Sequence, residues 1–342
     1  MSKKNMFWQI VRAICILAVI AIHCPNALNL SHSTFQFHLY VIVRALVNFP
    51  VAVFLFLAGY FINQEKCLAD KRTFFLNRGG VRLLIPYIVW SAIYMLVSRL
   101  GGDQLGASEI VWKLLTGKSA GPLYYVVVLI QLTLLTPYLI SCALKKSSWP
   151  WLITPAALVI VYVFAYRAEG VPWYCDTLFP LWFGFYYLGI RLRTEDIHIT
   201  SFLKKMGSIP CVLLSFLINL VESELLIHNG ITTTLAVSQN RIGGFLYALA
   251  IVGLFYRLSG IMNCKKNLLV WLGDNSYAIY FTHYLVLKIV TKTIGPRLHD
   301  MWTPYFGICF VSTLVMTSLI VGIVKLFARK VRLQSFLKYI GY

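Results

Sequence analysis

Acidic residues are scarce in this chain: Asp and Glu together number 12, against 31 Lys and Arg, in 342 residues. Charged residues of both signs make up only 13% of the sequence, whereas a soluble domain carries about a quarter. Hydrophobic residues reach 59%, and the mean hydropathy is +0.73. This composition excludes an ordinary soluble domain and indicates an integral membrane protein.

The sequence also lacks several patterns that would point to other chemistry. Its eight cysteines are scattered and form no Cys-x-x-Cys pair, so we expect neither a disulfide framework nor a metal site. No low-complexity segment is present, and no inverted repeat of the kind found in many transporters is visible.

Long hydrophobic runs, by contrast, fill most of the chain. A helix that crosses a bilayer needs about 20 apolar residues. Ten runs approach that length, at approximately 6–24, 38–63, 83–100, 121–143, 150–168, 173–191, 207–227, 240–258, 267–290 and 302–326. Because the loops between them are short, we predict one domain over residues 1–342, an all-α bundle of about ten transmembrane helices without a separate soluble domain.

The Lys and Arg residues that give the net charge of +19 lie mainly in the loops between the hydrophobic runs and do not form a stripe. Most of the Lys and Arg lie in alternate loops on the side of the N-terminus and in the C-terminal tail, which includes Lys338. The positive-inside rule then places both termini in the cytoplasm, which requires an even number of spans. We therefore expect a lipid bilayer, and no nucleic acid, as the partner of these charges.

Two titratable residues stand out in the first hydrophobic run, VRAICILAVIAIH (11–23). Arg12 and His23 are separated by about 16 Å and almost three full helical turns, so they share one face. An arginine inside a membrane costs about 2.5–3.5 kcal/mol and normally has a partner there. The pair predicts a site for a thin, anionic ligand along the helix. The alternatives are a snorkelling arginine and a hydrogen-bonded interfacial histidine.

This arginine–histidine spacing resembles the signature of the membrane-bound acyltransferase-3 family. Four further segments are similar to that family in the same order: VAVFLFLAGYF (51–61), RGGVRLLIPYIVW (78–90), GPLYYVVVLIQLTLLTPYL (121–139) and LVWLGDNSYAIYFTHYLV (269–286). Two departures are present. Ala58 replaces a usual serine, and Gly79 stands where the first of two arginines would fall. The resemblance covers residues 6 to 328.

The resemblance implies an activity and a location. Family members transfer an acyl group, usually acetyl, from cytoplasmic acyl-coenzyme A to a hydroxyl or amine of an envelope glycan or similar acceptor. By this likeness His23 is the catalytic base, and Arg12, Arg82 and Arg78 bind the donor, since arginine recognises phosphate by a bidentate fork. Acetyl-coenzyme A is then the co-substrate, a glycan or lipid-linked saccharide the acceptor, and a bacterial inner membrane the location. Ordinary positive-inside charge is the alternative for Arg78 and Arg82.

Other polar residues within the spans are candidates for the acceptor pocket. Ser276, Tyr280 and His283 share one helical face. Arg44 and Gln131 also lie inside predicted spans, where polar groups are costly. A structural histidine, helix capping at 274–276 and interfacial anchoring are the competing explanations.

Two other functional classes remain open from the residues alone. A polytopic transporter or flippase would share the many spans and the buried charges, but a coupled transporter more often carries carboxylates within its spans. A non-catalytic membrane partner in glycan assembly would fit the departures at Ala58 and Gly79. Binding of coenzyme A separates the enzyme from both.

Overall fold

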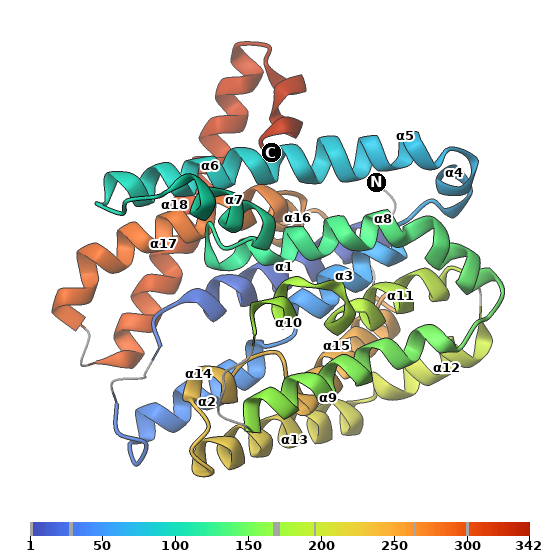
Figure 1. Ribbon diagram of the computed structural model, residues 1–342, viewed down its shortest axis with the longest axis horizontal. Coiled ribbons are helices and arrows are strands. Elements are labelled where there is room, and N and C mark those ends of the chain that lie inside the picture. Colours follow the sequence, from blue (N-terminus) through green and yellow to red (C-terminus); the bar gives the residue numbers. More distant parts are fainter. Residues whose placement is uncertain (1–2, 27–29, 167–171, 195, 263, 299–300) are drawn as a thin grey trace.

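The computed structural model describes residues 3–342 apart from 27–29, 167–171, 195, 263 and 299–300, and in this part of the chain all regular structure is helical (Figure 1). The first α-helices are α1 (Lys3–His23), α2 (Phe35–Val47), α3 (Pro50–Tyr60), α4 (Gln64–Ala69), α5 (Lys71–Phe75), α6 (Ile85–Leu100), α7 (Ala107–Thr116), α8 (Tyr124–Leu144) and α9 (Ile153–Tyr166). They are followed by α10 (Trp173–Thr177), α11 (Phe183–Leu192), α12 (Ile197–Met206), α13 (Ile209–His228), α14 (Thr233–Ala236), α15 (Ile242–Leu258), α16 (Leu268–Asp274), α17 (Ser276–Leu298) and α18 (Trp302–Lys330). A π-helix, η1 (Leu76–Leu84), joins α5 to α6. The short 3₁₀ segments are η2 (Gly121–Leu123), η3 (Trp149–Leu152), η4 (Phe179–Leu181) and η5 (Gln334–Tyr339).

The all-α fold is confirmed, but the count of ten spans is not. Among the described residues, six helical segments are long and apolar enough to cross a membrane: Met6–His23, Phe35–Tyr60, Lys71–Leu100, Gly121–Leu144, Ile209–His228 and Trp302–Lys330. The predicted runs 150–168 and 240–258 form shorter apolar helices, and residues 167 and 168 lie outside the described part. The predicted runs 173–191 and 267–290 are interrupted.

These interruptions coincide with specific residues. Pro180 lies inside η4, between α10 and α11, where a proline cannot donate the backbone hydrogen bond of a continuous helix. The segment from α2 to α3 bends at Asn48, whose side-chain amide donates to the carbonyl oxygens of Val237 (2.7 Å) and Ser238 (3.2 Å). Asn275 separates α16 from α17. Hydropathy alone does not register such breaks.

The first helix lies at the centre of the bundle, where α16, α17, α3 and α18 pack against it. The contact with α16 is close because Gly273 has no side chain. A Cβ atom at this position would lie 1.8 Å from the carbonyl oxygen of Gln9. The glycine therefore allows α16 to approach the turn of α1 that carries Arg12.

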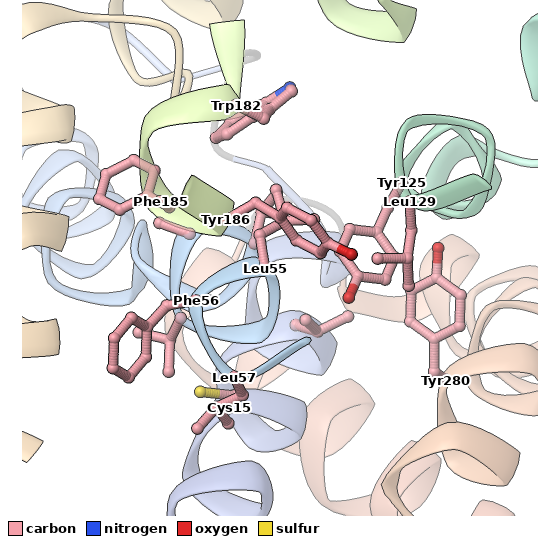
Figure 2. Packing of buried hydrophobic residues seen from close by; sticks show 14 of the residues in the cluster. Cys15, Leu55, Phe56, Leu57, Tyr125, Leu129, Trp182, Phe185, Tyr186 and Tyr280 are labelled. Atoms are coloured by element: carbon pink, nitrogen blue, oxygen red, sulfur yellow. The ribbon is translucent and has the colours of Figure 1, made fainter. Parts of the chain in front are cut away.

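Aromatic side chains fill much of the interior. Figure 2 shows Tyr186 of α11, Tyr125 of α8 and Tyr280 of α17 close to one another in the large buried cluster. The outward faces of α13 and α18 are also apolar, with Leu213, Leu217 and Leu319 exposed. A broad exposed apolar surface of this kind suits contact with lipid chains.

A buried ion pair joins α15 to α13. The Arg241 guanidinium lies 3.2 Å from Glu222 and also donates to the Asn219 side chain at 2.7 Å. Only 1% of Arg241 is exposed. Because its partners are all protein groups, this arginine serves the packing of the helices.

Candidate active site

A cavity of 1090 Å³ lies among the predicted residues. Arg12 of α1, Arg78 and Arg82 of η1, and Tyr125 of α8 line it. A further wall is formed at the junction of α16 and α17 by Gly273, Asp274, Ser276, Tyr277 and Tyr280. The structure thus brings the three predicted donor-binding arginines to one space, although they are far apart in the sequence.

The Arg12 side chain contacts Gln9 and Phe61, and the Asp274 carboxylate attracts its charge. Its guanidinium donates to the Gln9 side chain at 3.2 Å and lies 5.5 Å from the centroid of the Phe61 ring. No ion pair to Arg12 occurs among the residues that the structure describes. Its charge is therefore available to an anionic ligand in the cavity.

Arg78 and Arg82 reach the cavity from an unusual helix. Residues 76–84 are π-helical, a form that is rare in long stretches and is frequent at functional sites. The Arg78 guanidinium donates to the carbonyl oxygen of Ala58 at 2.5 Å and lies 5.9 Å from the Phe74 ring. The hydroxyl of Tyr277 donates to the Arg82 carbonyl oxygen at 2.9 Å, which ties η1 to α17.

The structure also defines the surroundings of Ala58 and Gly79. Arg78 uses the backbone oxygen of Ala58, so a serine side chain is not needed for this contact. At Gly79, an added Cβ atom would lie 2.5 Å from the Phe75 ring. A side chain there would require Phe75 to move, and Arg78 supplies a cavity arginine from the neighbouring position.

Cations outnumber carboxylates on the cavity wall. Lys66 and Lys338 join the three arginines, while Asp70 and Asp274 are the acidic lining residues. Hydrogen bonds from Thr73 lower the pKa of the Asp70 carboxyl, so it remains charged at neutral pH. The net positive charge that remains favours a ligand with several negative charges.

Tyrosines form one side of this space. The rings of Tyr125 and Tyr280 have centroids 5.7 Å apart, and the Tyr280 hydroxyl donates to the carbonyl oxygen of Pro122. Ser276 lies on the same cavity wall. Ser276 and Tyr280, which the sequence suggested for an acceptor pocket, are therefore placed beside the arginines.

Beyond Tyr280 lie two histidines. The His283 ring is centred 6.0 Å from Tyr280, and the His23 ring is centred 5.5 Å from His283. His283 is completely buried, whereas His23 retains partial exposure. A series of ring contacts thus connects the arginine-lined cavity to the histidine at the end of α1.

The hydrogen bonds of His283 fix its tautomer. Its Nδ1 atom lies 2.7 Å from the carbonyl oxygen of Tyr280 and 3.2 Å from that of Ile279. Since carbonyl oxygens only accept, Nδ1 carries the proton and Nε2 bears a lone pair. Nε2 is buried and has no hydrogen-bond partner in the structure. An unpartnered buried acceptor beside His23 is suited to proton transfer.

Arg44 and Tyr284 complete the surroundings of His23. The Arg44 guanidinium donates to the carbonyl oxygen of Ile22, so it caps the last turn of α1. The Tyr284 ring is centred 5.4 Å from His23, at 71° to it. Arg44 does not line the cavity of the arginines and lies instead beside the catalytic candidate.

Gln131 is placed elsewhere. Its side-chain nitrogen donates to the carbonyl oxygen of Thr177 at 2.9 Å, and its side-chain oxygen accepts from the Phe179 amide at 3.0 Å. Both ends of the amide are thus used to hold the segment before α11 against α8. Gln131 does not line the cavity of the arginines.

Sequence reasoning missed several residues that the structure brings to the site. Tyr284 contacts His23, and Lys66 and Lys338 add charge to the cavity. Tyr284 follows His283 directly, so it had a local signal. Nothing in the sequence placed Lys338 near Arg12. Among the described residues, no group of three or more His, Cys, Asp and Glu side chains could hold a metal ion.

Comparison with known proteins gives one match. The family described as Acyltransferase domain matches residues 6–321, which is most of the chain. No curated protein and no solved structure matches. The match spans every residue of the site described above except Lys338.

Proposed function

The chain belongs to the acyltransferase-3 family of membrane acyltransferases, and from that premise we propose that it transfers an acetyl group from acetyl-coenzyme A to a hydroxyl of a cell-envelope glycan or a lipid-linked saccharide. One structural observation supports acetyl-coenzyme A as the donor. A cavity of 1090 Å³ gathers Arg12, Arg78 and Arg82, and ring contacts connect it to His23. Acetyl-coenzyme A carries phosphate groups at one end and a thin arm that ends in a thioester at the other, which matches a cationic cavity connected to a histidine.

The donor enters from the cytoplasm in this proposal. The positive-inside rule assigns to the cytoplasm the segments that form the cationic wall, which lie around Lys66 and Arg78 and at Lys338. The arginines hold the phosphates by charge-assisted hydrogen bonds. The pantetheine arm then extends past Tyr125 and Tyr280 toward His23. We place the enzyme in the cytoplasmic membrane of a bacterium.

The residues around His23 supply the acid–base chemistry. The acceptor hydroxyl oxygen attacks the thioester carbonyl carbon while a ring nitrogen of His23 takes the hydroxyl proton. The carbon–sulfur bond breaks, the new ester forms, and the proton passes from His23 to the departing thiolate. The products are the acetylated acceptor and free coenzyme A.

Neighbouring side chains position this base. Arg44 holds the last turn of α1 through the Ile22 carbonyl, and Tyr284 packs against the His23 ring. His283 offers a fixed, unprotonated Nε2 beside His23, so it can share the transferred proton. Direct transfer needs no acyl-enzyme, and Cys24, which follows His23, is buried.

The test is binding and turnover of radiolabelled acetyl-coenzyme A by the protein in nanodiscs. We expect saturable binding and slow release of free thiol. A folded protein that binds neither acetyl-coenzyme A nor longer acyl-coenzymes A would overturn the proposal and favour transport or a non-catalytic role. His38→Ala is the matched control for His23→Ala, because His38 is exposed on α2 and pairs with Glu224 at the surface.

A further inference from the structure

Residues 331–342 follow α18 and fold back over the bundle; we call them the strap. Figure 1 shows this segment turning back at the end of α18 and descending toward α6, beside which the C-terminus lies. Its helical turn η5 packs against η1, α6 and α18. The strap therefore contacts the π-helix that carries Arg78 and Arg82. The strap lies outside residues 6–321, the range that the family model matches.

Specific contacts dock the strap between α6 and α17. The indole nitrogen of Trp90 donates to the carbonyl oxygen of Ile340 at 2.9 Å. The hydroxyls of Tyr342 and Thr282 lie 2.8 Å apart. Gly341 has a φ of +79°, and an added Cβ atom would lie 2.8 Å from the Phe281 ring. The backbone turn at Gly341 thus suits only glycine and brings Tyr342 under α17.

Docking places a lysine on the wall of the donor cavity. Lys338 lines the same space as Arg12 and Arg82. Its side chain is exposed, and its ammonium lies 4.9 Å from the centroid of the neighbouring Tyr339 ring. No ion pair involves Lys338 in the part of the chain that the structure describes. Lys338 therefore adds an exposed positive charge to the cationic wall of the cavity.

The strap reaches the reaction centre as well as the cavity. Thr282, the partner of Tyr342, immediately precedes His283, and Phe281 stacks on Trp90 with ring centroids 5.8 Å apart. The strap thus touches the turn of α17 that carries the buried histidine. Movement of residues 338–342 would change both the charge of the cavity and the packing behind His283.

We propose that the strap completes the donor site, with Lys338 as a ligand for the donor's phosphate groups and the Tyr342–Thr282 contact as its anchor. This inference rests on the proposed function. It adds a specificity-determining residue from outside the matched family region. A phosphate bound between Lys338 and the η1 arginines would hold the strap closed on α6 and α17.

The first experiment compares binding of coenzyme A with binding of pantetheine, which has no phosphate, in nanodiscs. Lys338→Gln should weaken coenzyme A binding by about tenfold and leave pantetheine binding unchanged, because only a charge-assisted contact to phosphate is lost. Lys338→Arg keeps the positive charge, so its dissociation constant for coenzyme A should lie within about twofold of the wild-type value. Lys330→Gln is the matched control, since Lys330 is exposed at the end of α18 and does not line the cavity.

Several outcomes overturn the inference. Coenzyme A binding by Lys338→Gln within about twofold of wild type removes the phosphate role and leaves the acyltransferase proposal intact. Equal loss of coenzyme A and pantetheine shows a change of cavity shape instead of a lost phosphate contact. Failure of wild type to bind coenzyme A removes the proposed function, and this inference with it.

A second readout tests the docking without activity. Cleavage by trypsin after Lys338 requires the helical turn η5 (Gln334–Tyr339) to open, because a protease binds extended backbone. Coenzyme A should slow this cleavage in wild type, and Tyr342→Phe should speed it because the contact to Thr282 is lost. Cleavage unaffected by coenzyme A would contradict a strap that closes on the donor.

Discussion

The rings of His23 and His283 lie 5.5 Å apart between centroids and are inclined at 41°. They come from α1 and α17, two helices that are distant in sequence and pack together at the centre of the bundle. His283 is fixed by carbonyl oxygens on Nδ1, and its Nε2 has no hydrogen-bond partner among the residues that the structure describes. The two histidines therefore form the chemical centre of the proposed site, and the arginine cavity forms its binding part.

Replacement of His283 should impair catalysis and spare donor binding. His283→Ala removes a buried acceptor beside the base, so we expect the rate at saturating acetyl-coenzyme A to fall by about a hundredfold or more. The dissociation constant of coenzyme A should change little, because His283 is absent from the cavity wall. Stopped-flow detection of released thiol measures the first quantity and equilibrium binding the second. A variant that turns over like wild type would show a purely structural histidine.

Loss of a cavity arginine should weaken donor binding. Arg12→Gln and Arg82→Gln each remove one charge that is available to phosphate, and we expect coenzyme A binding to weaken about tenfold. Binding should also become less dependent on salt, since fewer charges are paired. Arg99→Gln is the control, because Arg99 is exposed at the end of α6 and does not line the cavity. Equal salt dependence in all of these proteins would argue against phosphate binding.

Substitutions at Ala58 and Gly79 should have different effects on coenzyme A binding. Ala58→Ser should leave coenzyme A binding within about twofold of wild type, because Arg78 contacts the backbone oxygen at this position. Gly79→Arg should weaken binding despite its added charge, because the side chain would collide with Phe75. Titration calorimetry of both variants measures these effects. Improved binding by Gly79→Arg would refute the steric explanation.

A small change at the contact between α1 and α16 should destabilise the protein. Gly273→Ala places a Cβ atom against the carbonyl oxygen of Gln9, and overpacking of this kind costs about 1–3 kcal/mol. Gly307→Ala in α18 meets no atom within 4 Å and should leave the unfolding temperature unchanged or slightly raised. Thermal unfolding in detergent compares the pair. Identical midpoints would show that α16 can shift at no cost.

Parts of this account follow from the sequence because their causes are local. Hydrophobic length predicts α1, α8, α13 and α18, since each is a long uninterrupted apolar helix. The spacing of Arg12 and His23 predicts one helix with both residues, and the structure has it. Periodicity predicts that Ser276, Tyr280 and His283 share a face, and they do line or adjoin the cavity.

The rest depends on contacts between distant segments. Whether an apolar run breaks, as at Asn48 or Asn275, is decided by side chains that another loop or helix satisfies. Gln131 is a polar residue in a span, yet its amide is used by the backbone near Thr177. Lys338 reaches the cavity only because the strap folds back onto α6. No local pattern reports such tertiary pairings.

The most direct test of the central claim separates binding from chemistry by saturation. The rate of thiol release should be measured over a range of acetyl-coenzyme A concentrations for wild type, Arg12→Gln and His23→Gln, with His38→Gln as control. Excess acetyl-coenzyme A should restore the rate of Arg12→Gln to near the wild-type maximum. His23→Gln should bind acetyl-coenzyme A normally, but its maximal rate should stay at least about a hundredfold below that of wild type. A His23→Gln protein that reaches the wild-type maximal rate would contradict the claim that His23 is the base.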